Sequence, residues 1–190
     1  MNTSPAPYPR MPGLQYTEHV AFTVPNLDEA VRFFVEVLGA QELYRASRPA
    51  DASFMPENFD VPADSSMTLA MLRFPPNLNI ELFEWSSAAR RELAPRHCDA
   101  GGHHLCLTVE DVAAAVTVLR TIPGVRLLGD TKTVPSDSPN MAGSNWVYFL
   151  TPWGLLMELA ERSKTVNLPA LVGPAEWSSQ AHHPNHHEGA

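Results

Sequence analysis

The chain has 190 residues, and 44% of them are hydrophobic, which is enough for a globular domain with a buried core. Its formal net charge of −8 argues against nucleic acid or an anionic membrane surface as the main partner. No apolar run approaches the roughly 20 residues of a membrane span, and residues 1–11 contain no apolar segment typical of a secretory signal. Cys98 and Cys106 are too few for a disulfide framework, so we expect a cytoplasmic protein.

The two ends of the chain differ in composition from its middle. Residues 1–15 are rich in proline and small residues, and we interpret them as a flexible N-terminal arm. Residues 163–190 lack hydrophobic periodicity and include the histidine-rich run HHPNHH at 182–187. We interpret this C-terminal tail as a solvated segment whose histidines can bind metal adventitiously.

An internal repeat organises the middle of the chain. Residues 19–24 (HVAFTV) recur as residues 104–109 (HLCLTV), and both copies alternate between apolar and small or polar side chains. This period of two predicts a strand with one buried face. A helix is predicted after each strand at the same offset. It begins after Asn26 in the first copy, where Glu29 completes a capping box, and after Asp111 in the second.

Each predicted helix carries an apolar stripe that would cover its strand. The stripe residues are Leu27, Ala30, Val31, Phe34 and Leu38 in the first helix and Val112, Ala115, Val116 and Leu119 in the second. Gly39 is expected to end the first helix, and Pro123-Gly124 the second.

Three further strands are predicted in each half of the repeat. They cover residues 41–46, 67–74 and 79–85 in the first half and 125–133, 144–150 and 155–160 in the second. Each half therefore reads β-α-β-β-β, and the halves close on the similar phrases NIEL and LMEL. The sequence predicts an α+β fold in one domain, residues 16–162, made of two modules, residues 16–87 and 101–162.

Four ionisable side chains fall at equivalent positions of the repeat, on the first and last strand of each half. The alternation predicts that His19, Glu81, His104 and Glu158 all point away from the helices. A carboxylate inside a sheet is unfavourable unless it is paired or binds a metal. A single such residue is usually structural or solvated, but four at matched positions favour a divalent-metal site.

These residues resemble the vicinal oxygen chelate superfamily, also described as the glyoxalase/bleomycin-resistance/dioxygenase family. The resemblance spans about residues 16–162 and is carried by HVAFTVPNL from His19, WVYFLTPWG from Trp146, and the MEL that ends in Leu159. It implies two modules that form a paired, curved mixed sheet around a metal cleft.

The resemblance also implies a ligand set. His19, Glu81, His104 and Glu158 match the four ligand positions of bacterial glyoxalase I, so the expected cofactor is a divalent metal ion, Zn, Ni, Mn or Fe. Methylmalonyl-CoA epimerases are similar, although they often have Gln at the position of Glu81. No basic cluster here suits the phosphates of coenzyme A, or glutathione.

The ligand set favours a lyase or isomerase that moves a proton next to a metal-chelated oxygen of a small metabolite. Glu81 and Glu158 are the predicted catalytic residues, with Glu158 as the tighter ligand and Glu81 as the mobile base. One alternative is an Fe(II)-dependent extradiol-type dioxygenase with His19, His104 and Glu158 as ligands. Another is a non-catalytic small-molecule-binding protein of the resistance type.

Five residues are candidates for substrate contact. Phe83 and Trp85 share a strand face with a predicted ligand, whereas Trp146 and Tyr148 lie on a neighbouring strand, and all four are equally compatible with a core role. Arg73 is a candidate for an anionic group, although a charged residue near a strand end is more often solvated.

Two loops and the assembly complete the expectations. Residues 47–66 and 135–143, rich in Pro, Ser and Asp, are candidate lids over the cleft. We expect a small-molecule substrate, no nucleic acid, no membrane and a homodimer. The sequence leaves open whether the cleft forms within one chain or between two.

Overall fold

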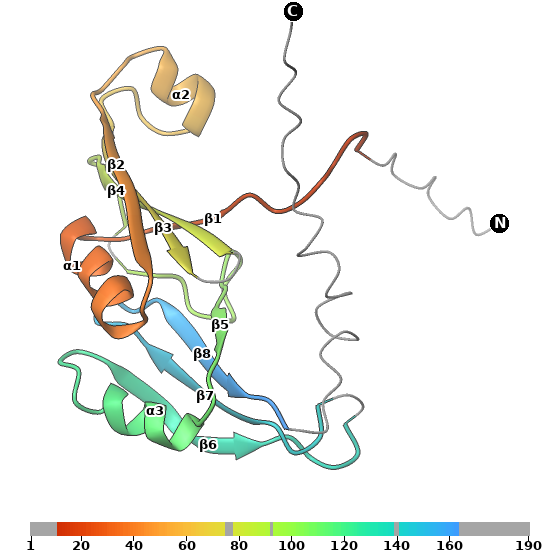
Figure 1. The fold of residues 1–190 in the computed structure, drawn as a ribbon. Coiled ribbons are helices and arrows are strands. Elements are labelled where there is room, and N and C mark those ends of the chain that lie inside the picture. Colours follow the sequence, from red (N-terminus) through yellow and green to blue (C-terminus); the bar gives the residue numbers. More distant parts are fainter. Residues whose placement is uncertain (1–10, 75–77, 92, 139–140, 164–190) are drawn as a thin grey trace, which may run out of the picture. The chain divides into compact units, whose positions relative to one another are not determined.

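The structure, a computed structural model, describes residues 11–74, 78–91, 93–138 and 141–163. The chain divides into two compact units, Met1–Arg90 and Arg91–Ala190. Each unit contains a four-stranded sheet with a helix packed against it (Figure 1). Most of the predicted N-terminal arm and all but the first residue of the predicted tail, including its histidine cluster, lie outside the described residues.

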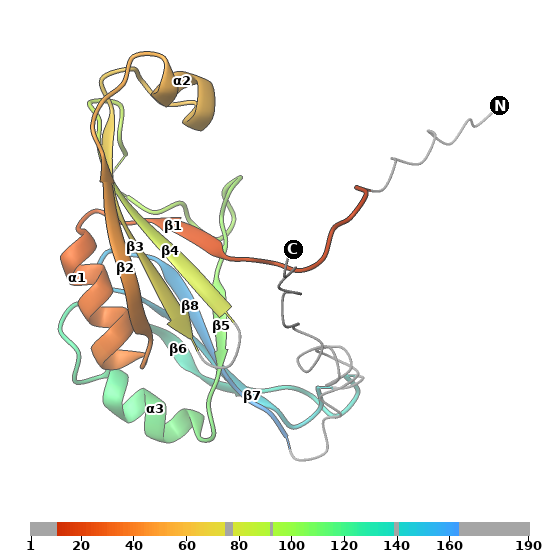
Figure 2. The ribbon, with the colours of Figure 1, turned by 45° about the horizontal axis from the view of Figure 1, so that its top comes forward.

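The first unit has the predicted order of elements with one addition. Its elements are β1 (Val20–Thr23), α1 (Leu27–Arg32), the π-helical turn η1 (Phe33–Val37), β2 (Gln41–Arg48), α2 (Phe54–Phe59), β3 (Ser66–Phe74) and β4 (Leu78–Ser86). The strand order in the sheet is β1-β4-β3-β2, with β1 parallel to β4 and the other neighbours antiparallel. The addition is α2, which lies beyond the ends of β2 and β3 (Figure 2) and which the hydrophobic pattern did not predict.

The second unit repeats this topology. Its elements are β5 (Leu105–Thr108), α3 (Val112–Leu119), β6 (Arg126–Thr133), β7 (Asn145–Leu150) and β8 (Leu156–Glu161). The strand order is β5-β8-β7-β6, and the first strand is again parallel to the last. The predicted α+β fold of two β-α-β-β-β modules is therefore confirmed. None of the described helices has the length and apolar composition of a membrane span.

Both helices begin at the predicted capping residues. The Asn26 side-chain oxygen accepts a hydrogen bond from the Glu29 N–H at 2.9 Å, and the Asp111 carboxylate accepts one from the Ala114 N–H at 2.9 Å. These side chains satisfy N–H groups that have no partner within the helix. After η1, Gly39 adopts a φ of +77°, a conformation that glycine takes at little cost and that turns the chain toward β2.

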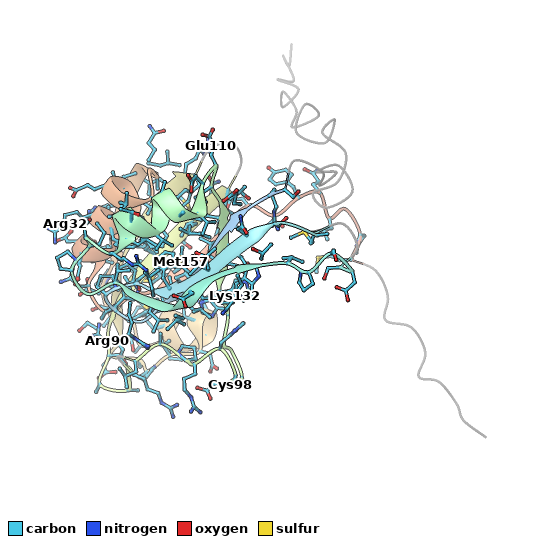
Figure 3. The ribbon with its side chains drawn as sticks, turned by 90° about the horizontal axis from the view of Figure 1, so that it is seen from below. Arg32, Arg90, Cys98, Glu110, Lys132 and Met157 are labelled. Carbon is cyan, nitrogen blue, oxygen red and sulfur yellow. The ribbon has the colours of Figure 1, made fainter. Side chains whose placement is uncertain are left out.

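The strands bury the faces that the alternation predicts. Phe22 and Val24 in the first unit and Met157 and Leu159 in the second are buried. Figure 3 shows Met157 among neighbouring side chains, whereas Lys132, on the edge strand β6, is exposed. Of the predicted helix stripes, Leu38 and Ala115 are half-buried rather than buried. Leu38 follows the wider π-helical turn, which displaces it from the α-helical stripe.

Candidate functional site

The first unit brings His19 and Glu81 together. His19 directly precedes β1, and the parallel pairing of β1 with β4 places Ala21 opposite Glu81. As a result, the Nε2 atom of His19 lies 3.3 Å from Oε2 of Glu81. The Glu81 side chain is 14% exposed and the His19 side chain 36%, so the carboxylate is the more enclosed partner.

The second unit builds the same arrangement from His104 and Glu158. His104 directly precedes β5, and Cys106 is paired with Glu158 across β5 and β8. The Nε2 atom of His104 lies 3.0 Å from Oε2 of Glu158, and the two side chains are 29% and 18% exposed. The internal repeat is therefore preserved in these side-chain pairs as well as in the backbone.

The geometry of each pair fits two ligands of one divalent cation. Metal–nitrogen and metal–oxygen bonds of about 2.0–2.2 Å place neighbouring ligand atoms about 3.0–3.5 Å apart. The two measured separations, 3.3 and 3.0 Å, fall within this range. Within either unit, the described residues form no group of three or more His, Cys, Asp or Glu that could hold a metal ion. Each unit thus supplies two of the four predicted ligands.

Tyr148 is the neighbour of Glu158 on the adjacent strand β7. Its ring meets the His104 ring edge-on, with centroids 5.3 Å apart, and the Trp146 ring with centroids 5.2 Å apart. Partial burial raises the pKa of the Tyr148 phenol, and the Glu158 carboxylate beside it raises this pKa further. The phenol is therefore protonated at neutral pH and can donate a hydrogen bond to Glu158.

Cys106 lies on the other side of Glu158 and did not feature among the predicted site residues. Cys106 is exposed, but partial desolvation of its sulfur, reinforced by the Glu158 carboxylate, raises the pKa of the thiol to about 11, while Arg162 acts in the opposite direction. A thiol with this pKa is protonated at neutral pH and is a poor nucleophile. Cys106 consequently lines the surroundings of Glu158 as a neutral group.

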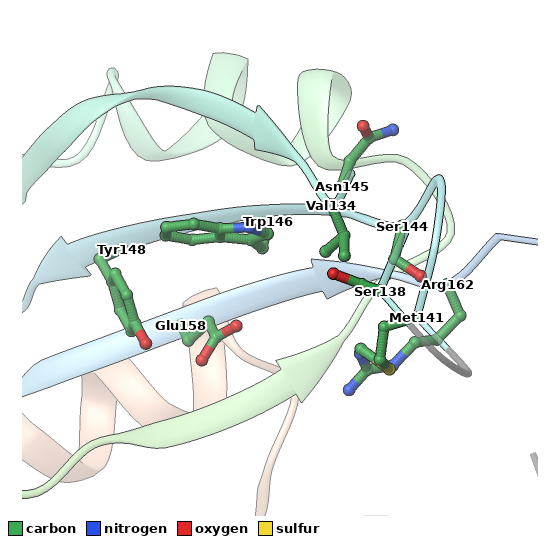
Figure 4. Close-up of a pocket in the computed structure, with 9 residues that line it drawn as sticks. All are labelled: Val134, Ser138, Met141, Ser144, Asn145, Trp146, Tyr148, Glu158 and Arg162. Atoms are coloured by element: carbon green, nitrogen blue, oxygen red, sulfur yellow. The ribbon is translucent and has the colours of Figure 1, made fainter. Parts of the chain in front are cut away.

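A pocket of about 340 Å³ opens beside Glu158 in the second unit (Figure 4). Its lining residues are Val134, Ser138, Met141, Ser144, Asn145, Trp146, Tyr148, Glu158 and Arg162. Trp146, Tyr148 and Glu158 lie next to one another on β7 and β8, whereas Arg162 and Met141 lie at the opposite end, where the Arg162 guanidinium donates to the Met141 sulfur at 3.3 Å. The predicted substrate residues Trp146 and Tyr148 thus line a pocket that also contains a predicted ligand.

In the first unit, the predicted substrate residues Phe83 and Trp85 lie on the strand that carries Glu81. Their rings stack with centroids 5.9 Å apart. Phe59 of α2 packs edge-on against Trp85 at 5.4 Å, so the candidate lid of residues 47–66 contacts the strand of Glu81. The remaining candidate, Arg73, is exposed, and its Nε donates to the Asn79 side-chain oxygen at 3.0 Å.

Several residues of this region carry no signal in the sequence. His97 lies in the loop before β5, and its Nε2 is 3.3 Å from Nδ1 of His104. Ser138, Asn145 and Arg162 reach the pocket from a loop and two strand ends. None of these residues lies in the recurring phrases HVAFTV/HLCLTV and NIEL/LMEL, so internal similarity does not reveal them.

Comparison with known proteins gives consistent matches. Residues 18–137 match the family described as the Glyoxalase/Bleomycin resistance protein/Dioxygenase superfamily. A protein of Actinomyces sp. named 2-epi-5-epi-valiolone epimerase is 48% identical over 160 residues, which cover 84% of this chain and 83% of that protein.

Two solved structures illustrate the similarity of fold. A glyoxalase family protein from Bacillus cereus has a TM-score of 0.63 at 24% identity, covering 80% of this chain and 99% of that one. The trypanothione-dependent glyoxalase I of Leishmania major has a TM-score of 0.53 at 20% identity, covering 78% of this chain and 87% of that one.

Proposed function

This chain belongs to the glyoxalase/bleomycin resistance protein/dioxygenase superfamily and is an isomerase-type enzyme, and we propose that it epimerises 2-epi-5-epi-valiolone or a closely related hydroxylated ketone. The predicted family is thereby confirmed. The observation that carries the proposed substrate is the 48% identity, over most of both chains, to the relative of that name. The two His/Glu pairs supply imidazoles and carboxylates that can bind a metal ion, and a carboxylate that can act as the base in such a reaction.

The metal site is the second part of the proposal. We propose that His19, Glu81, His104 and Glu158 together hold one divalent cation, Zn, Ni, Mn or Fe. The support is that each pair has the separation of two neighbouring ligands and combines an imidazole with a carboxylate, a set that such ions accept. When bound, the cation would act as a Lewis acid toward a substrate oxygen.

The carboxylates are assigned to proton transfer. Epimerisation next to a carbonyl removes a proton from carbon and returns a proton to the opposite face, which requires a base within reach of that carbon. Across the sheet, Glu158 neighbours the phenol of Tyr148, whereas Glu81 neighbours the thioether of Met71. Because the phenol can hold one carboxylate in place, we assign Glu158 as the anchored ligand and Glu81 as the base.

The pocket beside Glu158 suits a hydroxylated ring. Ser138 and Arg162 offer a hydroxyl and a guanidinium to hydroxyl groups of a ligand. Trp146 adds a flat aromatic surface on the same wall as Glu158. A ring bound here would place one edge next to the assigned ligand Glu158.

Incubation of the purified protein with 2-epi-5-epi-valiolone in D2O, followed by NMR, tests the reaction. We expect an epimer with one solvent deuterium at the inverted carbon. Removal of metal with a chelator should stop the reaction, and readdition of a divalent ion should restore it. Absence of both epimer and deuterium exchange would contradict the proposal. An O2-dependent ring-opened product would support the dioxygenase alternative instead.

A further inference from the structure

Both ring nitrogens of His104 have a defined partner. Nε2 lies 3.0 Å from Glu158, and Nδ1 lies 3.3 Å from Nε2 of His97. The two imidazole rings are nearly perpendicular, at 87°, with centroids 5.1 Å apart. His97 also lies near Tyr148, with ring centroids 6.0 Å apart, so it contacts two residues that surround Glu158.

The loop that carries His97 is closely organised. The Arg96 guanidinium binds the Asp99 carboxylate through two hydrogen bonds, at 2.8 and 3.1 Å, on either side of His97 in the sequence. The Gly102 N–H then donates to the Asp99 carbonyl at 2.8 Å. A Cβ at Gly102 would lie 2.3 Å from the carbonyl oxygen of Arg96 and 2.7 Å from that of His97, so this close approach requires glycine.

The first unit provides a different partner at the equivalent nitrogen. Nδ1 of His19 is hydrogen-bonded to the carboxylate of Glu18. The Asn79 amide donates to the Glu18 carbonyl at 3.2 Å, and Arg73 in turn donates to the Asn79 oxygen at 3.0 Å. In both units, therefore, the imidazole nitrogen turned away from the glutamate is held by a side chain that lies outside the four ligands.

We propose that His97 and Glu18 are positioning residues that orient the two histidine ligands, an inference that rests on the metal site proposed above. A metal-binding histidine commonly donates its second ring N–H to an acceptor, which fixes the tautomer and the ring orientation. With the cation bound, the Nδ1–H of His104 would donate to Nε2 of His97, and the Nδ1–H of His19 would donate to Glu18. Nε2 of each ligand histidine would then be unprotonated and available to the cation beside its glutamate.

The geometry of His97 separates this role from that of a fifth ligand. Its Nε2 is occupied by Nδ1 of His104, on the side of that ring away from Glu158. Removal of His97 should therefore weaken metal binding without abolishing it, in contrast to removal of His104. A glutamine at position 97 retains a side-chain acceptor and should restore much of the binding.

Zn²⁺ affinity, measured by competition with a chromophoric chelator, tests the proposal. We expect His97→Ala and Glu18→Ala to bind Zn²⁺ about 10- to 100-fold more weakly than the original chain. The affinity of His97→Gln should lie between that of His97→Ala and that of the original chain. Gly102→Ala should also weaken binding, since it displaces the loop while leaving every side chain of the site intact. Glu110→Gln changes an exposed carboxylate two residues after β5, outside this loop, and should leave the affinity unchanged.

Two further measurements make the result decisive. In the Zn²⁺-loaded chain, ¹⁵N NMR should show His104 bound through Nε2 with its proton on Nδ1. Thermal unfolding of the metal-free His97 and Glu18 variants should match that of the original chain. If the original chain binds Zn²⁺ and His97→Ala binds it equally well, or loses it as completely as His104→Ala, the positioning role is refuted. If the original chain binds no divalent ion, the proposed metal site itself fails.

Discussion

The carboxylate of Glu84, at the end of β4, accepts a hydrogen bond of 2.6 Å from the main-chain N–H of Leu27, the first residue of α1. The second unit repeats the contact, with Glu161 accepting from the N–H of Val112 at 3.1 Å. Each of these glutamates stands three residues after a proposed metal ligand on the same strand. Alternation therefore turns one carboxylate toward the site and the other toward the helix.

Because of these contacts, substitution of Glu84 or Glu161 should lower the stability of the fold without lowering the turnover of the enzyme. A negative charge at a helix N-terminus is favourable, and the first N–H groups have no partner within the helix. We expect Glu84→Gln and Glu161→Gln each to lower the free energy of unfolding by about 1 kcal/mol. Urea unfolding followed by circular dichroism measures this, with Glu36→Gln, an exposed glutamate, as the control. Midpoints equal to that of the control would refute the prediction.

Metal content tests the ligand set directly. His19→Ala combined with His104→Ala should remove most of about one divalent ion per chain while the domain stays folded, because the core lies on the opposite strand faces. Elemental analysis of protein purified without an affinity tag provides the measurement. Deletion of residues 163–190, which removes the terminal histidines, should leave the ion in place. Full occupancy in the double variant of the shortened chain would exclude these histidines as ligands.

The two carboxylates are expected to differ in their response to substitution. Glu81→Gln should retain substantial metal and lose turnover by at least about 10², since the amide keeps an oxygen donor but removes the base. Glu158→Gln should chiefly weaken metal binding. Glu84→Gln and Glu161→Gln are matched controls on the same two strands and should turn over like the original chain.

Solvent deuterium exchange distinguishes a rate that is lower because the base is missing from a rate that is lower because metal is lost. The Glu81→Gln variant should fail to exchange the substrate hydrogen even when it is saturated with metal. Normal turnover in both Glu81→Gln and Glu158→Gln would exclude proton transfer by these carboxylates.

The reactivity of Cys106 should report its surroundings. With a pKa of about 11, only about one thiol in a thousand is ionised at pH 8. In a metal-free Cys98→Ser variant, alkylation by iodoacetamide should therefore be slow at pH 8 and rise about tenfold per pH unit up to pH 10. Mass spectrometry of the peptide that contains Cys106 follows the reaction. A rate that levels off near pH 9 would show that partial desolvation and Glu158 do not raise this pKa.

Local patterns in the sequence predicted most of the backbone and both His/Glu pairs. Alternation along residues 19–24 and 104–109 assigned the buried faces, and the capping residues Asn26 and Asp111 marked the helix starts that the structure confirms. Internal similarity then linked each His to a Glu more than 50 residues away. These features were predictable because side-chain direction in a strand and the start of a helix depend on near neighbours in the chain.

Only the tertiary structure decided what surrounds these pairs. The contacts of Glu84 with Leu27 and of Glu161 with Val112 join residues 57 and 49 positions apart, and the contact of His97 with His104 depends on the path of an irregular loop. The helix α2 reaches Trp85 from an insertion that the second module lacks. Such contacts depend on which loops and strand ends lie close together in the folded chain. A periodic pattern of hydrophobic residues does not predict which of them do.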